Sequence, residues 1–399
     1  MCPPGSGLRV SGHVGGRRVQ GDLTKGEEMS IRSTWRHLRR RSDRSFQVEK
    51  PRRKRPVLLG LLVAAGLSLV LAGAAMAATI IGDGNANNLT GTFARDSVAG
   101  RGGNDTVNAL AGADQVRAGA DNDVVNAGRG GDDVLGGGGD DVLNGDHGSD
   151  RLLGSGGTDR LNGGSGRDLA RGGEGNDAIR GGGGVAGRRG DRLHGNLGND
   201  SIVGGSGFDL ITGNAGADQL TGGAGCDRIF AGPDDDRLAG GEGLSFRRFR
   251  CERLHGGAGN DTATGGAGRD FMSGGQGDDI QSGGGGTDKI FANPGRDVSD
   301  GGDGRDVLWA LARVDVAFIG DPDGDELTGG EGGDRFLVRD GEVDKIHCGG
   351  GNDRVLADQF DQIDTDCEHV DRRNITSIDQ IQDQEENSTE NPPEDDDEG

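Results

Sequence analysis

The sequence predicts an all-β solenoid built from nine-residue repeats, and three observations support this prediction. Aspartate recurs every nine residues, as at Asp141, Asp150 and Asp159. The residue two positions after each aspartate is usually aliphatic, and the four or five residues before it are mostly glycine. A period of nine matches neither the helix nor the strand repeat, so the repeating unit must be a larger structure that is buried by stacking on its neighbours.

The nine-residue spacing extends through most of the chain. With a five-residue insertion after 177 and a longer insertion after 236, the repeated aspartates stand at positions 96, 105, 114, 123, 132, 141, 150, 159, 168, 177, 191, 200, 209, 218, 227, 236, 261, 270, 279, 288, 297, 306 and 315. Two units are expected to form one coil of 18 residues. Aspartates 18 apart should then lie on the same edge, in coils about 4.8 Å apart.

Each unit is expected to be a glycine turn followed by a very short strand. Glycine adopts positive φ without steric cost, and this allows a tight turn. The aliphatic residue, such as Val107, Leu143, Ile179 or Leu220, is expected to point inward. With one inward side chain in nine residues, the core should be thin.

Eleven stretches contain the pattern GGxGxD in full. They begin at residues 136, 163, 172, 204, 222, 256, 265, 274, 283, 301 and 329. Together with the aliphatic residue that follows, this pattern resembles the calcium-binding nonapeptide of RTX (repeats-in-toxin, hemolysin-type) proteins, which are secreted bacterial proteins. The resemblance covers roughly residues 82–356. It implies a right-handed parallel β-roll in which multiple Ca²⁺ ions are held between turns by aspartate carboxylates and glycine-turn carbonyls.

The chemistry of the residues supports calcium as the ligand. Ca²⁺ takes about six to eight oxygen ligands from carboxylates and backbone carbonyls, and an aspartate beside a glycine turn offers both. Without the ion, each edge would stack like charges in a chain with little apolar burial, so folding should require the metal. The candidate ligands are Asp105, Asp114, Asp132, Asp141, Asp150, Asp159, Asp168, Asp177, Asp200, Asp209, Asp218, Asp227, Asp261, Asp270, Asp279, Asp288, Asp297, Asp306 and Asp334.

The best sites are expected where two complete GGxGxD turns stand 18 residues apart. Four pairs of aspartates meet this condition: Asp209 with Asp227, Asp261 with Asp279, Asp270 with Asp288, and Asp288 with Asp306. Weaker sites are expected near Asp123, Asp236 and Asp315, because their turns lack the glycine framework.

The alternative to a calcium-binding solenoid is a disordered, glycine-rich acidic region, which the composition of 84 glycines and 31% hydrophobic residues would suit. Disorder does not explain a fixed register over more than twenty units, although we expect disorder in the absence of calcium.

The N-terminal part of the chain predicts export. Residues 1–56 are basic, and the KGEEM segment that ends at Met29 predicts a translation start there, which would leave residues 1–28 outside the protein. Residues 57–77 form an uncharged apolar stretch that ends in Ala-Met-Ala, which is typical of a signal peptide cleaved before Ala78. An uncleaved membrane anchor is the alternative. Both place the repeats outside the cytoplasm, although the RTX family usually lacks an N-terminal signal.

Charge and composition disfavour several partners. Residues 1–56 contain 15 Lys and Arg and 5 Asp and Glu. The rest of the chain therefore contains 29 Lys and Arg and 62 Asp and Glu, which gives it a net charge of −33. An acidic surface repels phosphate, and with 3% aromatic residues there is little stacking surface. We therefore expect no nucleic-acid partner. The sequence shows no small-molecule substrate and identifies no cell-surface partner.

Four cysteines follow the apolar stretch, in two similar segments. The segment 226–254, with Cys226 and Cys251, resembles 352–370, which contains Cys367 and follows shortly after Cys348, so one local pair per copy is expected. This predicts disulfides Cys226–Cys251 and Cys348–Cys367, with free thiols as the alternative. Zinc is disfavoured because no C-x₂-C spacing exists.

We expect a β-roll over residues 78–321, degenerate repeats with a C-terminal cap over 322–370 and a disordered acidic tail over 371–399. The segment 321–330, DPDGDELTGG, is interpreted as one of the degenerate repeats.

No catalytic motif occurs, and regular rows of carboxylates suit a cation better than an acid–base pair, so we predict no enzyme activity. The leading interpretation is a secreted calcium-binding protein with a structural or cell-surface role. A calcium-dependent folding module of a secreted toxin or enzyme, and a ligand-binding solenoid, remain alternatives.

Overall fold

The computed structural model describes residues 12–14, 17–19, 76–183, 189–243, 252–310 and 324–376. The chain divides into two units, Met1–Val70 and Leu71–Gly399. In the first unit, β1 (Gly12–Val14) and β2 (Arg17–Val19) pair in antiparallel fashion. Several predictions fall outside the described residues: the start at Met29, the apolar stretch up to residue 75, Asp315, Cys251 and the tail from residue 377.

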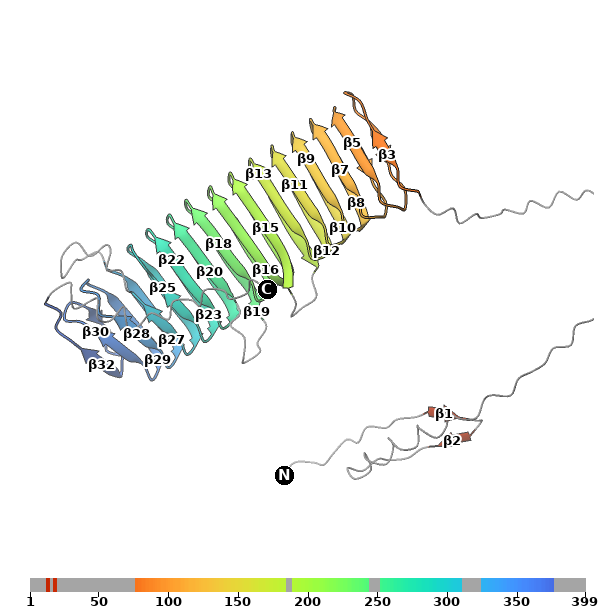
Figure 1. Ribbon diagram of the computed structural model, residues 1–399. Coiled ribbons are helices and arrows are strands. Elements are labelled where there is room, and N and C mark those ends of the chain that lie inside the picture. The colour runs from red at the N-terminus through yellow and green to blue at the C-terminus, as the bar shows by residue number, and fades with distance from the viewer. Residues whose placement is uncertain are drawn as a thin grey trace, which may run out of the picture. The chain divides into compact units, whose positions relative to one another are not determined.

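The second unit is a parallel β-solenoid of about 15 turns with two strand-bearing faces (Figure 1). The first sheet contains β3 (Thr79–Ile81), β5 (Ser97–Gly102), β7 (Gln115–Ala120), β9 (Asp133–Gly138), β11 (Arg151–Gly156), β13 (Leu169–Glu174), β15 (Arg189–Leu197), β18 (Arg228–Pro233), β20 (Arg253–Ala258), β22 (Phe271–Gln276), β24 (Lys289–Phe291), β26 (Val307–Trp309), β28 (Arg335–Val338), β30 (Arg354–Ala357) and β32 (His369–Arg372). The second sheet contains β4 (Asn88–Thr90), β6 (Thr106–Asn108), β8 (Val124–Gly130), β10 (Val142–Gly148), β12 (Arg160–Gly166), β14 (Ala178–Gly183), β17 (Gln219–Gly225), β19 (Arg237–Gly243), β21 (Thr262–Gly268), β23 (Ile280–Gly286), β25 (Val298–Gly304), β27 (Glu326–Gly332), β29 (Lys345–Gly351) and β31 (Gln362–Ile363). The long strand β16 (Ser201–Ala215) pairs in both sheets.

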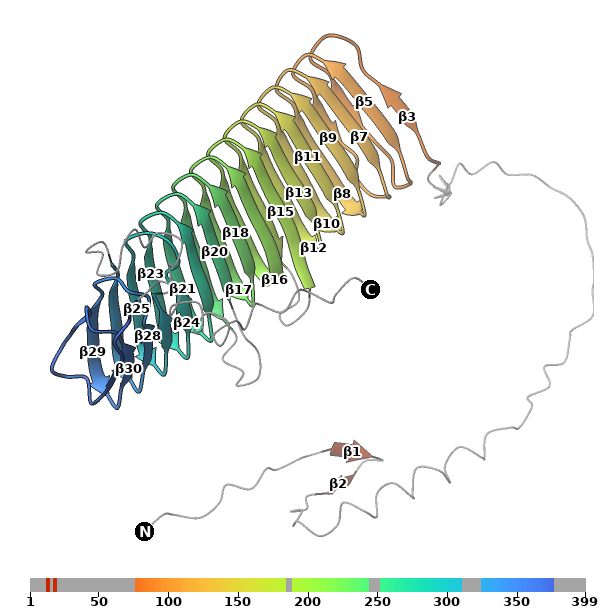
Figure 2. The same cartoon turned by 60° about the vertical axis from the view of Figure 1, so that its left-hand side comes forward.

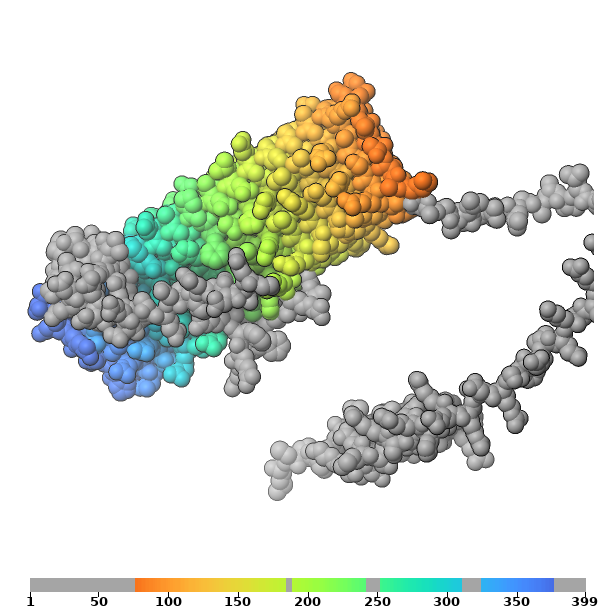
Figure 3. Space-filling model, viewed as in Figure 1, coloured from red at the N-terminus to blue at the C-terminus, as the bar shows by residue number. Residues whose placement is uncertain are grey.

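Apart from β16, which pairs with β15 and β17, strands pair with the second strand before and after them in the sequence, because each coil contributes one strand to each sheet (Figure 2). In the second sheet Leu143 pairs with Leu161, and in the first sheet Leu152 pairs with Val134. Both separations are 18 residues, which confirms the predicted coil. In the space-filling view the colours follow one another along this unit, so coils that touch are neighbours in the sequence (Figure 3).

The core is a pair of stacked columns of apolar side chains, one column under each sheet. Leu143, Leu161 and Ile179 stack in the second-sheet column, and Leu152 lies in the first-sheet column. Each is at most 2% exposed. The inward positions of the second sheet become polar at Gln281 and Ser299, whose side chains are equally buried. The alternation of inward aliphatic and outward polar residues therefore builds the predicted thin core, with one weak section.

Three insertions interrupt the repeat without breaking the stack. The register passes across them from Leu169 to Arg192, from Arg228 to Arg253 and from Val307 to Arg335. The strand pairing resumes in the same order on both sides of each insertion. Among the described residues, no helix is long and apolar enough to cross a membrane.

The ordered C-terminal cap extends further than the sequence predicts. Strand β32 continues to Arg372, and Ile375 is 3% exposed and exchanges two hydrogen bonds with Gln359. The predicted tail therefore cannot begin at residue 371, because residues 371–376 belong to the cap. The predicted Cys348–Cys367 disulfide is present in this cap. The pairing of Cys226 with Cys251 stays a prediction, because Cys251 lies outside the described residues.

Candidate calcium sites

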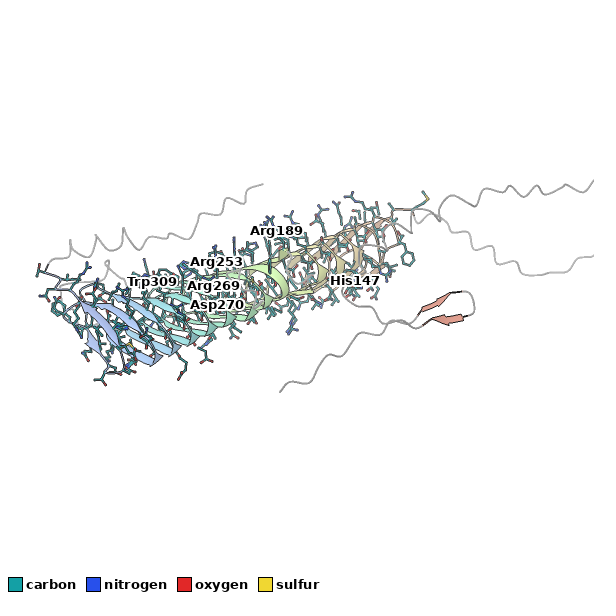
Figure 4. All side chains as sticks on the ribbon, turned by 90° about the horizontal axis from the view of Figure 1, so that it is seen from below. His147, Arg189, Arg253, Arg269, Asp270 and Trp309 are labelled. Atoms are coloured by element: carbon teal, nitrogen blue, oxygen red, sulfur yellow. A yellow bond between two sulfur atoms is a disulfide. The ribbon has the colours of Figure 1, made fainter. Side chains whose placement is uncertain are left out.

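The repeated aspartates form two hydrogen-bonded ladders along the solenoid. In each ladder one carboxylate oxygen, Oδ1, accepts the backbone N–H of the aspartate one coil earlier. The N–H of Asp123 donates to Asp141 at 2.8 Å, and the N–H of Asp141 donates to Asp159 at 2.8 Å. Asp270, labelled in Figure 4, accepts the N–H of Glu252 at 3.0 Å in the same way. A charged acceptor and an amide donor make one of the stronger hydrogen bonds in proteins.

Each ladder precedes the strands of one sheet. The first ladder consists of Asp96, Asp114, Asp132, Asp150, Asp168, Asp191, Asp209, Asp227, Glu252, Asp270, Asp288, Asp306, Asp334, Asp353 and Glu368. The second ladder consists of Asp105, Asp123, Asp141, Asp159, Asp177, Asp200, Asp218, Asp236, Asp261, Asp279, Asp297, Asp325, Asp344 and Asp361. Apart from Asp361 and Glu368 at the C-terminal end, the members are at most 3% exposed.

The second carboxylate oxygen of almost every member is buried and has no hydrogen-bond partner. This holds for Oδ2 of Asp141, Asp150 and Asp288, and for Oε1 of Glu252. Buried polar atoms are normally paired, and an unpaired buried carboxylate oxygen costs several kcal/mol. A repeated row of such oxygens therefore indicates a cationic ligand that is shared along the row.

The glycine turns leave room beside these oxygens. A Cβ on Gly145 would lie 2.6 Å from Oδ2 of Asp150 and 2.6 Å from the carbonyl oxygen of Gly163 in the next coil. The first glycine of the turn therefore keeps open a space bordered by a carboxylate and a carbonyl oxygen, which a side chain would fill. These are the hard oxygen donors that Ca²⁺ prefers, so the donor set fits the ion.

Burial also raises the pKa of these carboxyl groups. Desolvation is the largest cause, and neighbouring carboxylates add to it: the pKa of Asp141, Asp150 and Asp288 rises to about 7. The pKa of Glu252 rises to about 9 for the same reasons, and among the neighbouring carboxylates Asp227 contributes most. The metal-free ladder thus disfavours the charged forms, which a bound cation would stabilise.

All nineteen residues predicted as ligands lie in the two ladders, and each of the four predicted pairs is adjacent within one ladder. A fifth pair of complete turns, Asp306 with Asp334, is also adjacent. It is missed by the rule of 18 residues because the insertion between them raises their separation to 28.

Asp123 and Asp236, where the sequence predicts weaker sites, are members of the second ladder. The ladders also contain members that the sequence analysis did not name as sites: Asp96, Asp191, Glu252, Asp325, Asp344, Asp353, Asp361 and Glu368. Glu252 replaces aspartate after an insertion, and Asp325, not Asp315, follows Asp297 in its ladder. The acid-x-aliphatic signature, as in Glu252-Arg253-Leu254, could have identified most of them.

Turns without the full glycine framework keep the ladder but change its surroundings. The turn before Asp123 has Ala118 in place of the first glycine, and its Asp121 takes a positive φ of 73°. Positive φ is uncommon for residues other than glycine and costs energy. The methyl group of Ala118 takes up part of the space that glycine leaves open elsewhere.

Fold and site together define a parallel β-solenoid whose coils are joined by rows of buried carboxylates suited to a cation. A family model described as RTX calcium-binding nonapeptide repeat (4 copies) matches residues 81–244 and 252–310, which is more than half of the chain. The chain belongs to this family and contains a calcium-binding RTX repeat solenoid.

Among solved structures, the chain is similar to a hyperactive, Ca²⁺-dependent, β-helical antifreeze protein from an Antarctic bacterium. The identity is 20%, the match covers 70% of this chain and 83% of that chain, and the TM-score is 0.32. A comparison with curated proteins finds no match.

Proposed function

We propose that this chain is an exported calcium-binding protein whose solenoid folds when several Ca²⁺ ions bind between successive coils, and that its role is structural or at the cell surface. The observation that supports the proposal most strongly is the pair of ladders with their buried, unpartnered carboxylate oxygens. The aspartate Oδ2 atoms and the glycine-turn carbonyls would hold the ions. Bound calcium would neutralise the carboxylates and join one coil to the next.

The described solenoid begins directly after the expected cleavage site, which supports export. Met76 is 83% exposed, Ala77 is also exposed, and β3 begins at Thr79. The N–H of Ala78 donates to Oδ1 of Asp96 at 2.6 Å, at the start of the first ladder. After cleavage this donor would be an ammonium group, which would strengthen its bond to the carboxylate. N-terminal sequencing of exported protein tests this: we expect a start at Ala78, and a retained apolar stretch would favour the membrane anchor.

A structural role agrees with how the carboxylates are arranged. They are spread evenly along two rows and differ little in surroundings, whereas an acid–base pair needs two groups whose pKa values are pushed apart. The described strands of the solenoid run from Thr79 to Arg372. We therefore favour the roll itself as the functional unit over a module that serves a toxin or an enzyme.

Equilibrium dialysis against radioactive calcium tests the proposal. The full chain should bind several ions at a free calcium concentration of about 1–10 mM, above the range typical of extracellular modules. Substituting magnesium should not support the same stoichiometry, because Mg²⁺ demands a smaller and more regular site. Binding of one ion or none at these concentrations would reject the proposal.

A further inference from the structure

The outer face of the first sheet is basic, although the chain as a whole is acidic. In each strand, the residues one and three positions after the ladder carboxylate point outward, because the residue between them is the inward core residue. From β11 to β30, these outward positions hold no Asp or Glu and eight Lys and Arg, which we call the basic face: Arg151, Arg171, Arg192, Arg228, Arg253, Lys289, Arg335 and Arg354. Arg253 is labelled in Figure 4.

Strand pairing brings members of the basic face close together. Arg171 pairs with His194, which stands two residues after Arg192, and Arg335 pairs with Arg354. All four arginines are exposed. Burial, as the largest cause, and then the positive charges of Arg171 and Arg192 lower the pKa of His194. Positive charge therefore accumulates on this side of the solenoid.

The second sheet does not show the same excess of charge. From β12 to β29, its outward positions hold four Lys and Arg and two Asp and Glu: Arg160, Arg180, Arg237, Lys345, Asp300 and Glu326. Lys345 lies 3.9 Å from Glu326. The basic face is thus a property of the first sheet and not of the repeat in general.

Residues 377–399 lie outside the described part of the chain, but their sequence carries the opposite charge. They contain ten Asp and Glu and no Lys, Arg or His, and five of the ten acidic residues stand together at positions 394–398. The described chain leads into this segment from the first sheet, since β32 is the last strand of that sheet and Ile375 is bound to Gln359. The acidic segment therefore starts at one end of the sheet that carries the basic face.

The acidic segment is long enough to reach most of the basic face. Ten strand steps separate β32 from β13 in the first sheet, which is about 50 Å at the usual spacing of strands. Residues 377–399 span roughly 75 Å when extended. Because the segment is joined to the solenoid, its effective concentration at this face is on the order of 1 mM.

We propose that residues 377–399 dock on the basic face of the same chain. Seven of the eight basic residues are arginines, whose guanidinium groups form charge-assisted, bidentate hydrogen bonds with carboxylates. Calcium bound along the ladders would neutralise the carboxylates that precede these strands and so strengthen the attraction. The inference rests on the proposed function only because calcium keeps the solenoid folded. The docked segment occupies a surface that would otherwise be open to other polyanions.

The test uses the two lysines of the described solenoid, which lie on opposite sheets. Lys289 belongs to the basic face, whereas Lys345 lies in β29 of the second sheet. Carbodiimide coupling joins a lysine amine directly to a carboxylate. The full chain is coupled in saturating calcium, its fold is checked by circular dichroism, and the links are mapped by mass spectrometry. A mixture of unlabelled and isotope-labelled chains separates links within one chain from links between copies.

We expect Lys289 to be linked to carboxylates of residues 377–399 within one chain, and Lys345 to be linked to them rarely. The Lys289 link should be lost in about 1 M sodium chloride, where charges are screened beyond about 3 Å. Arg192→Gln/Arg335→Gln should lower its yield about threefold, the loss expected for two surface ion pairs of ordinary strength. The matched control Arg160→Gln/Arg180→Gln removes two arginines from the second sheet and should leave the yield unchanged.

A second measurement uses dextran sulfate as an external polyanion. The variant Asp395→Asn/Asp396→Asn/Asp397→Asn should bind it several-fold more tightly than the full chain does, because the weakened acidic segment competes less for the basic face. Equal binding would contradict the proposal.

The docking would be overturned if a folded chain gave no Lys289 link, or if Lys345 were linked to residues 377–399 equally often. Links found only between copies would assign the basic face to a second copy instead. A chain that stayed unfolded in saturating calcium would reject the proposed function, whereas a folded chain without the link would reject the docking alone.

Discussion

The two carboxylate oxygens of each repeated aspartate have different surroundings. Oδ1 is satisfied by the backbone N–H of the coil before, as in the 2.7 Å bond from Asp288 to Asp306, so it holds the coils in register. Oδ2 is buried beside the first glycine of its turn and lacks a partner. The same side chain therefore stabilises the stack through one oxygen and creates the need for a cation through the other.

This difference predicts unequal effects of removing aspartates. Asp288→Ala should raise the calcium midpoint for folding more than Asp123→Ala does. Asp288 follows an open turn, in which a Cβ on Gly283 would lie 2.7 Å from Oδ2, whereas Ala118 already occupies this place in the turn of Asp123. Circular dichroism during a calcium titration measures both midpoints. Equal midpoints would show that the glycine framework does not set the strength of a site.

The polar section of the core predicts a stabilising substitution. Ser299 is 1% exposed, and its hydroxyl group has no hydrogen-bond partner. Ser299→Ala should raise the free energy of unfolding in saturating calcium by about 1 kcal/mol, because an unsatisfied buried hydroxyl costs about that much. Urea unfolding measures the change, with Ser282→Ala on the outer side of the neighbouring strand as the control. A loss of stability on removing the Ser299 hydroxyl would mean that the group has a partner after all.

At the scale of elements, the disulfide ties the last coils to the solenoid. Cys348 in β29 is bonded to Cys367, just before β32. The double variant Cys348→Ala/Cys367→Ala should lose about 3 kcal/mol of stability, the value expected for a loop of this length. Hydrogen exchange should become faster in residues 362–372 before it does so in the central coils. Unchanged protection there would show that the cap is held by packing and hydrogen bonds alone.

The repeat made the coil, the register and the inward columns predictable, because one nine-residue signal specifies turn, ladder member and core residue together. The ladder members that follow an insertion could not be predicted from the nine-residue spacing. A rule of fixed spacing passes over Glu252 and Asp325, although the backbone pairing continues across both insertions. The end of the cap was also misplaced, because the burial of Ile375 depends on a contact with Gln359 that no local pattern indicates.

At the scale of the whole molecule, the metal-free solenoid contains two rows of buried carboxyl groups. Burial is the main cause that raises the pKa of Asp141, Asp150 and Asp279 from 3.8 to about 7. Between these pH values the folded chain holds more protons than the unfolded chain, so the metal-free fold loses stability as pH rises through this window. In a chelator, we expect more β structure at pH 5.5 than at pH 7.5. Equal or greater β structure at pH 7.5 would contradict the claim that these carboxyl groups are buried in the metal-free fold.

The central claim is that calcium joins the coils of this solenoid at neutral pH. Far-ultraviolet circular dichroism of the full chain at pH 7.5, recorded in excess chelator and then during a calcium titration, tests this claim most directly. The account predicts a spectrum without β structure in chelator and a cooperative transition to β structure as calcium is added, reversed when chelator is restored. A fully β-structured chain in excess chelator at this pH would contradict it.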